Sequence, residues 1–179
     1  MQSQKAQTVA RLGMLFALAM ALSFFESVVT PFLGLMPAMK LGLANIVVMY
    51  ALLFTRRRYA LMLVVLKAAF TLFVRGATAG FLSLCGGMLS WLVMCALLCL
   101  PFRVTGYIFS VCGALAHNIG QLLGASVILS SALALGYAPV LLAAGLVVGS
   151  LTWWVARGVF PALKRFSRGE GQGRNKILF

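Results

Sequence analysis

Six long apolar runs constrain this chain more than any other feature of its sequence. They lie near residues 9–30, 41–54, 59–75, 78–100, 104–134 and 137–160. A helix that crosses the hydrocarbon core of a membrane needs about 20 apolar residues, at about 1.5 Å per residue. The second and third runs are shorter and depend on flanking residues. The pattern predicts an all-α integral membrane protein, with a six-transmembrane-helix bundle over residues 1–165 and a basic cytoplasmic tail over residues 166–179.

Composition and charge support this class and predict the orientation. Only 9% of the 179 residues are charged, whereas a soluble domain carries about 25%. If the chain crosses the membrane six times, most of its cations lie on the same side of that membrane. They are Lys5, Arg11, Arg56, Arg57, Arg58, Arg103, Arg157, Lys164, Arg165, Arg168, Arg174 and Lys176. The positive-inside rule identifies that side as the cytoplasm, so both termini are expected there. The net charge of +13 then reflects topology and attraction to anionic membrane lipids.

Two alternative interpretations of the charged ends are weaker. The basic tail is typical of a solvated terminus, and no nucleic-acid partner is expected. The N-terminal stretch, with Lys5 and Arg11 before LGMLFALAMALSFF, has the features of a signal peptide. Its cleavage would leave five helices with their ends on opposite sides, against the cation pattern. We therefore expect a multi-pass protein of a bacterial plasma membrane that retains this first helix.

Polar side chains recur on single faces of the predicted helices. The first helix carries such a face in its outer half: Ser23, Glu26, Ser27 and Thr30. Lys67, Thr71 and Arg75 are spaced by four in the third helix, and His117 and Gln121 in the fifth, so each set shares a face. Lys40 and Asn45 open the second helix. The candidate binding residues are Glu26, Lys40, Asn45, Lys67, Thr71, Arg75, His117, Asn118 and Gln121.

Energetics predict that these groups face one another or a cavity. A charged side chain at the bilayer centre costs about 2.5–3.5 kcal/mol and normally lines a site or pairs internally. Glu26 can neutralise one of the three cations, which leaves positive charge for a small anionic solute in an outward-opening pocket. Alternatively, Lys40 and Arg75 reach the outer interface while Glu26 and Lys67 form a structural ion pair. Likewise, His117 either lines a ligand-binding site or forms hydrogen bonds between helices.

Small residues and cysteines complete the pattern. Gly13, Ala17 and Ala21 repeat every four residues on the first helix, where another helix of this chain or another membrane protein can pack closely. The four cysteines lie within apolar runs without nearby metal-binding partners, and we interpret them as small buried side chains. We expect neither a bound metal nor a cofactor.

Three segments carry a resemblance to a known family. They are MKLGLANIVVMYALLF (39–54), SLCGGMLSWLVM (83–94) and GALAHNIGQLL (113–123), after a first helix that ends in LSFFES (22–27). Over roughly residues 10–165 the chain resembles the Gx transporter family, also labelled heptaprenyl diphosphate synthase component I. That family is related to the substrate-binding S components of energy-coupling-factor (ECF) transporters.

The resemblance implies an importer subunit that captures a small solute, such as a vitamin or cofactor precursor, from outside. The solute is then held by the outer halves of six helices, and a coupling subunit with two ATPases drives transport. S components of this type dock through small residues spaced by four on the first helix. Gly13, Ala17 and Ala21 match this pattern, with glycine at a place where alanine is usual.

The enzymatic label is not supported by the residues. Prenyl diphosphate synthases hold Mg²⁺ on clustered aspartates, because hard cations need oxygen ligands. This sequence contains no aspartate, its two acids are Glu26 and Glu170, and it has no Walker motif. We therefore expect no enzyme. The rival interpretations are a non-catalytic membrane subunit of a redox or prenyl-lipid and quinone system and, less favoured, a subunit of a prenyl diphosphate synthase.

Overall fold

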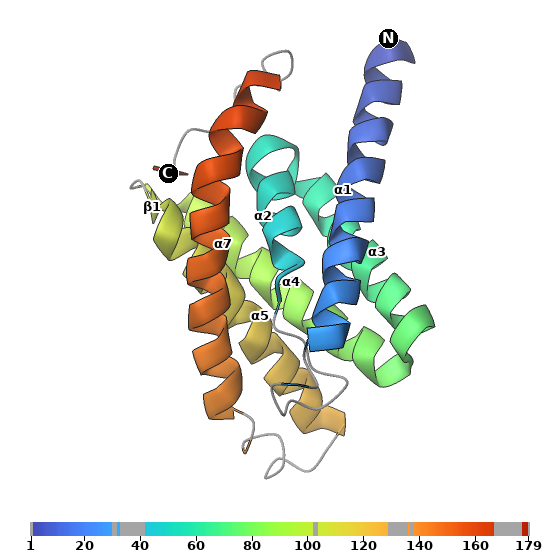
Figure 1. Ribbon diagram of the computed structural model, residues 1–179, viewed down its shortest axis with the longest axis vertical. Helices are drawn as coiled ribbons and strands as arrows, with labels where there is room; N and C mark the ends of the chain where they lie inside the picture. Colours follow the sequence, from blue (N-terminus) through green and yellow to red (C-terminus); the bar gives the residue numbers. More distant parts are fainter. Residues whose placement is uncertain are drawn as a thin grey trace.

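The chain folds into a bundle of helices that alternate in direction (Figure 1). The computed structural model describes residues 2–29, 32, 42–101, 104–128, 136, 138–166 and 177–178. Within these residues the long elements are α1 (Gln2–Val29), α2 (Asn45–Phe54), α3 (Arg57–Arg75), α4 (Ala77–Cys99), α5 (Gly106–Ile128) and α7 (Ala138–Phe166). α1 begins at the end of the bundle where α7 finishes, as an even number of crossings requires.

Among the described residues, four helices are long and apolar enough to cross a membrane, and they are the four that the longer runs predicted. These spans are Ala6–Val29, Ala77–Cys99, Gly106–Ile128 and Ala138–Gly158. α2 has only 10 residues, a length of about 15 Å. α3 has 19 residues but carries cations at both ends and in its middle. The structure thus confirms an all-helical, multi-pass membrane protein, while six crossings and cytoplasmic termini stay predictions.

Glycines set how closely the helices approach α4, which packs against both α3 and α5. A Cβ added at Gly87 would lie 2.7 Å from Val64 Cγ1 of α3, and one at Gly120 would lie 2.6 Å from the carbonyl oxygen of Cys85. Such distances are well inside van der Waals contact. Gly87 of α4 and Gly120 of α5 therefore let helices pack on two sides of α4, because neither added side chain would fit.

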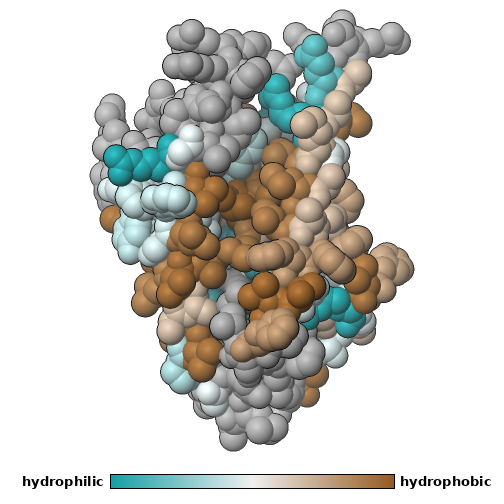
Figure 2. Space-filling view, in the orientation of Figure 1, coloured by the Kyte–Doolittle hydropathy of each residue, from teal (hydrophilic) through white to brown (hydrophobic). Residues whose placement is uncertain are grey.

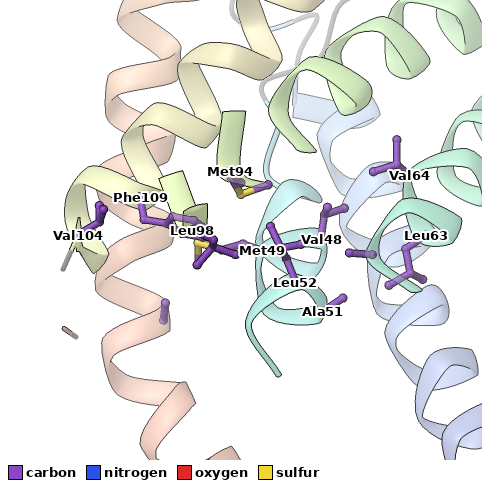
Figure 3. Close-up of a cluster of buried hydrophobic side chains, with 12 residues drawn as sticks. Val48, Met49, Ala51, Leu52, Leu63, Val64, Met94, Leu98, Val104 and Phe109 are labelled. Atoms are coloured by element: carbon purple, nitrogen blue, oxygen red, sulfur yellow. The ribbon is translucent and has the colours of Figure 1, made fainter. Parts of the chain in front are cut away.

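The main apolar core surrounds α2 at the end of the bundle where α1 begins (Figure 3). Val48, Met49 and Leu52 of α2 contribute to a cluster with residues of α3, α4, α5 and α7. A second, smaller cluster of Leu82, Ala125, Leu141 and Val148 joins α4, α5 and α7. The short helix α2 is thus held in place by side-chain packing on several helices.

The outer surface is apolar over a broad band, with hydrophilic residues above and below it in Figure 2. Large apolar side chains of the described helices are exposed, among them Phe73 at 85%, Met14 at 75% and Trp154 at 70%. Exposed apolar area of this extent is typical of a lipid-facing surface.

One feature was not predicted from the sequence. Val104–Thr105 (β1) pairs in parallel with Ile177–Leu178 (β2). This short ladder ties a segment near the C-terminus to the start of α5, at the edge of an otherwise helical fold.

We expect Gly120→Ala to lower the free energy of unfolding by about 1–3 kcal/mol, the usual cost of overpacking. The added methyl group would meet backbone atoms of Cys85 and Gly86, which cannot rotate away. Gly158→Ala is the matched control, because a Cβ there meets nothing within 4 Å. Thermal unfolding of both variants in detergent measures the difference, and equal stability of the two would contradict the packing described here.

Candidate functional site

Opposite charges meet inside the bundle at Glu26 of α1 and Lys67 of α3. Each side chain is only 1% exposed, and electrostatic attraction acts between them. The carboxylate also accepts a hydrogen bond from the backbone N–H of Leu43, just before α2. Glu26 therefore bonds the entrance to α2 and attracts the cation in the middle of α3.

The polar face predicted for α3 is present. Thr71, which is 1% exposed, lies one turn after Lys67 and donates its hydroxyl to the Lys67 carbonyl oxygen at 2.9 Å. Arg75 is the last residue of α3 and is partly buried, and it too is attracted by the Glu26 carboxylate. α3 thus carries cations from its buried middle to its end, all on the side that faces α1.

His117 and Gln121 of α5 lie on the face that packs against α4, and both are 0% exposed. A Cβ added at Gly86 would lie 2.9 Å from His117 Cε1 and 2.9 Å from Gln121 Cγ. On its other side the imidazole meets Gly42, where an added Cβ would lie 2.9 Å from Cδ2. Gly42 also has a φ of +94°, which favours glycine. The ring is therefore held between a glycine of α4 and a glycine of the segment before α2.

The segment Gly42–Leu43 connects the two groups. Gly42 touches His117, and the N–H of Leu43 binds Glu26. Residues from α1, α3 and α5 thus meet around two consecutive residues of the motif KLGLAN. We refer to Glu26, Lys67, Thr71, His117 and Gln121, together with Gly42–Leu43, as the polar centre.

Asn45 takes part in a hydrogen-bond network next to the polar centre. Its Nδ2 donates to Ser90 Oγ at 2.6 Å and to the Gly113 carbonyl oxygen at 3.4 Å. Ser90 Oγ donates to the same carbonyl at 2.7 Å. The network joins α2, α4 and α5. Ser90 was not among the binding residues predicted from the sequence. Its apolar surroundings and its place in the second segment of the resemblance could have identified it as a candidate.

Asn118 faces away from the polar centre. Its Nδ2 donates to the Leu141 carbonyl oxygen of α7 at 2.6 Å, since consecutive helical residues differ by about 100° in direction. Within the described part of the chain, three buried oxygens have no hydrogen-bond partner: Asn45 Oδ1, Ser83 Oγ and Asn118 Oδ1. Buried polar atoms usually have a hydrogen-bond partner, so each of these three oxygens can accept a hydrogen bond from a further donor group.

The structure differs from the open pocket that the sequence suggested. The polar and charged side chains of the polar centre are 0–1% exposed, because the glycines of α4 and of the entrance to α2 let the helices close around them. Lys40 lies outside the described residues, so its expected place in the site is not described.

The proposed docking stripe lies on the outside of the described helices. Gly13, Ala17 and Ala21 are exposed, and a Cβ added at Gly13 meets nothing within 4 Å. The inward face of α1 carries Ala19, Ser23 and Glu26 instead. The prediction that the cysteines are buried was wrong for Cys99, which is exposed at the end of α4 and accepts hydrogen bonds from Arg57. The other three cysteines are partly buried.

Fold and polar centre together define a multi-pass helical membrane protein with charged and hydrogen-bonding groups in its interior. Residues 15–159 match the family described as heptaprenyl diphosphate synthase component I. The match covers most of the chain, so the protein belongs to that family, as the sequence resemblance indicated. No curated protein and no solved structure matches the chain.

We expect Ser90→Ala to lower the free energy of unfolding by about 1 kcal/mol, the range measured for hydrogen bonds between membrane helices. The change leaves Asn45 with a single long bond to Gly113. Ser126→Ala is the matched control, because the Ser126 hydroxyl bonds only a local carbonyl, that of Leu123, and is exposed. Denaturant unfolding in mixed micelles measures both, and an equal effect would contradict the role of the network.

Proposed function

We propose that this protein is the substrate-binding S component of an ECF-type importer that captures a small anionic organic solute from outside. The single observation that carries the proposal is the burial of Lys67 with Glu26 beside Gly42–Leu43. Charged groups inside a membrane protein are costly, and they commonly mark a solute pathway. Family membership is in keeping with the proposal but does not name a substrate.

Charge balance favours an anion. Within the described residues Glu26 is the only carboxylate side chain, and it attracts both Lys67 and Arg75. One negative charge thus faces two positive charges, and Lys40 would add a third. A carboxylate or phosphate of the solute would restore neutrality. The free oxygens of Asn45 and Ser83 would receive N–H or O–H groups of the same solute.

Glu26 then acts as an internal counter-ion. In the closed arrangement its carboxylate occupies the place beside Lys67 and also bonds Leu43. A solute anion that reaches Lys67 competes with Glu26 and frees the Leu43 N–H. Binding and movement of the entrance to α2 are therefore coupled through one carboxylate.

The exposed stripe Gly13, Ala17 and Ala21 is the proposed contact with the coupling subunit. The exposure of all three residues, and the open space around Gly13, support that assignment. Two ATPases would complete the importer, because this sequence has no nucleotide-binding motif of its own. The protein itself is proposed to be no enzyme and to reside in a bacterial plasma membrane.

One rival function deserves a direct comparison. A non-catalytic membrane subunit of a redox or quinone system would use the same polar centre for the head group of a long-chain lipid. Mass spectrometry of compounds extracted from gently purified protein separates the two. A water-soluble anion supports the importer, and a quinone or isoprenoid as the sole extracted compound supports the rival.

Lys67→Ala should reduce the amount of the extracted anion by at least about tenfold, since charge-assisted hydrogen bonds contribute about 1.5–3 kcal/mol each. Leu66→Ala is the matched control, because Leu66 is the preceding residue and is 42% exposed. Quantitative mass spectrometry of the two variants and the wild type measures the effect. Equal retention by both variants would contradict the assignment of Lys67.

Glu26→Gln should have the opposite effect on binding. Removing the internal counter-ion leaves Lys67 available, so we expect the anion identified in the wild-type extract to bind more tightly. The same change should destabilise the empty protein by about 3–5 kcal/mol, because a buried charge loses its partner. Thermal unfolding with and without that anion measures both effects. Weaker binding by Glu26→Gln would mean that the carboxylate itself contacts the solute.

A further inference from the structure

A cysteine and an arginine meet where α4 ends and α3 begins. Both terminal nitrogens of the Arg57 guanidinium contact the Sγ atom of Cys99, Nη1 at 3.6 Å and Nη2 at 3.5 Å. Cys99 is exposed, whereas Arg57 is partly buried. The guanidinium is therefore the inner partner of this contact, and the sulfur is open to reagents from the surroundings of the protein.

Two further residues of α4 hold Arg57 at this place. Trp91, about two turns before Cys99, donates its Nε1–H to the Arg57 carbonyl oxygen at 3.3 Å. Cys95, one turn before Cys99, interacts electrostatically with both Arg57 and Cys99. Residues spaced by four share one face of a helix. One face of α4 thus presents an indole and two thiols to the first residue of α3.

The surroundings of the exposed thiol are positively charged. Arg56 and Arg58 flank Arg57 in the sequence and are exposed. Glu26 is the only carboxylate side chain within the described residues, and it bonds Leu43, just before α2. The three arginines follow α2, whose 10 residues span about 15 Å. A cluster of one sign of charge raises the local concentration of molecules of the opposite sign, so this thiol should meet anionic reagents most often.

We propose that Cys99 is a thiol-modification site that forms a mixed disulfide with an anionic low-molecular-weight disulfide, such as the oxidised form of a thiol peptide that carries carboxylates. The thiol first gives its proton to water, because the thiolate is the nucleophile. Its sulfur then attacks one sulfur of the disulfide, and a new S–S bond forms as the old one breaks. Cys99 is oxidised, and the second sulfur leaves as a reduced thiolate with the electron pair and takes up a proton from water.

Arg57 contributes before and after this exchange. Before it, the guanidinium attracts the anionic disulfide to the sulfur that it contacts. After it, the sulfur belongs to a neutral disulfide, and the guanidinium can bind a carboxylate of the attached group through paired hydrogen bonds. The site follows α2, whereas the polar centre lies at the start of α2, so this inference does not depend on the proposed function.

Reaction of the full-length protein in detergent with three disulfides tests the proposal. Oxidised glutathione is anionic, 2-hydroxyethyl disulfide is neutral and cystamine is cationic. Intact-mass spectrometry over time gives each rate of adduct formation, which is divided by the rate of the same reagent with the neutral thiol N-acetylcysteine amide. Relative to the neutral disulfide, oxidised glutathione should react about threefold faster and cystamine about threefold slower, the effect of one charge at about 6 Å in water.

Variants assign the adduct and its charge preference. Cys99→Ser should form no adduct at the wild-type rate. Arg57→Gln should lose at least about half of the preference for oxidised glutathione, and Arg57→Lys should retain most of it. Arg157→Gln is the matched control, because that guanidinium lies on α7 over the Trp153 ring, 5.6 Å from its centroid, and the preference should not change.

Thermal unfolding of each variant shows whether it is folded, and the Arg57→Lys variant keeps the test valid if Arg57→Gln is not. Three results would overturn the proposal. They are adduct formation by Cys99→Ser at the wild-type rate, equal normalised rates for the three disulfides in the wild type, and equal loss of preference in Arg57→Gln and Arg157→Gln.

Discussion

The attraction between Glu26 and Lys67 is the interaction on which the rest of the interior depends. Each charge would be costly alone in an apolar bundle, and breaking a buried pair costs about 3–5 kcal/mol. The same carboxylate binds the backbone of Leu43. A single side chain of α1 therefore bonds the entrance to α2 and attracts a cation in the middle of α3. The imidazole of His117 then packs against that entrance at Gly42.

Close packing on α4 makes this arrangement possible. Gly86 accepts α5 and Gly87 accepts α3, so both helices pack closely against one central helix. The hydrogen-bond network of Asn45 and Ser90 joins α2 to α4 and α5. The interior is thus closed by glycines and held by hydrogen bonds.

Much of the fold could be predicted from the sequence, because apolar length and helical periodicity are local properties. The four long spans were predicted correctly, and spacing by four correctly placed Lys67 with Thr71 and His117 with Gln121. The direction of Asn118 toward α7, the role of Ser90, the left-handed Gly42 and the β1–β2 pair were not predicted. Each of these depends on contacts between segments far apart in the chain. The closure of the site also depends on such contacts, which is why an open pocket was expected instead.

The central claim is that a solute reaches Lys67 from outside the membrane, and site-directed labelling tests it most directly. Thr71→Cys, one turn after Lys67, in a variant that lacks the four native cysteines can be exposed to a membrane-impermeant methanethiosulfonate reagent in right-side-out vesicles. The account predicts slow labelling from the outside that the bound anion prevents, whereas inverted vesicles show none. Labelling only from the cytoplasmic side, or labelling that the anion does not change, would contradict it.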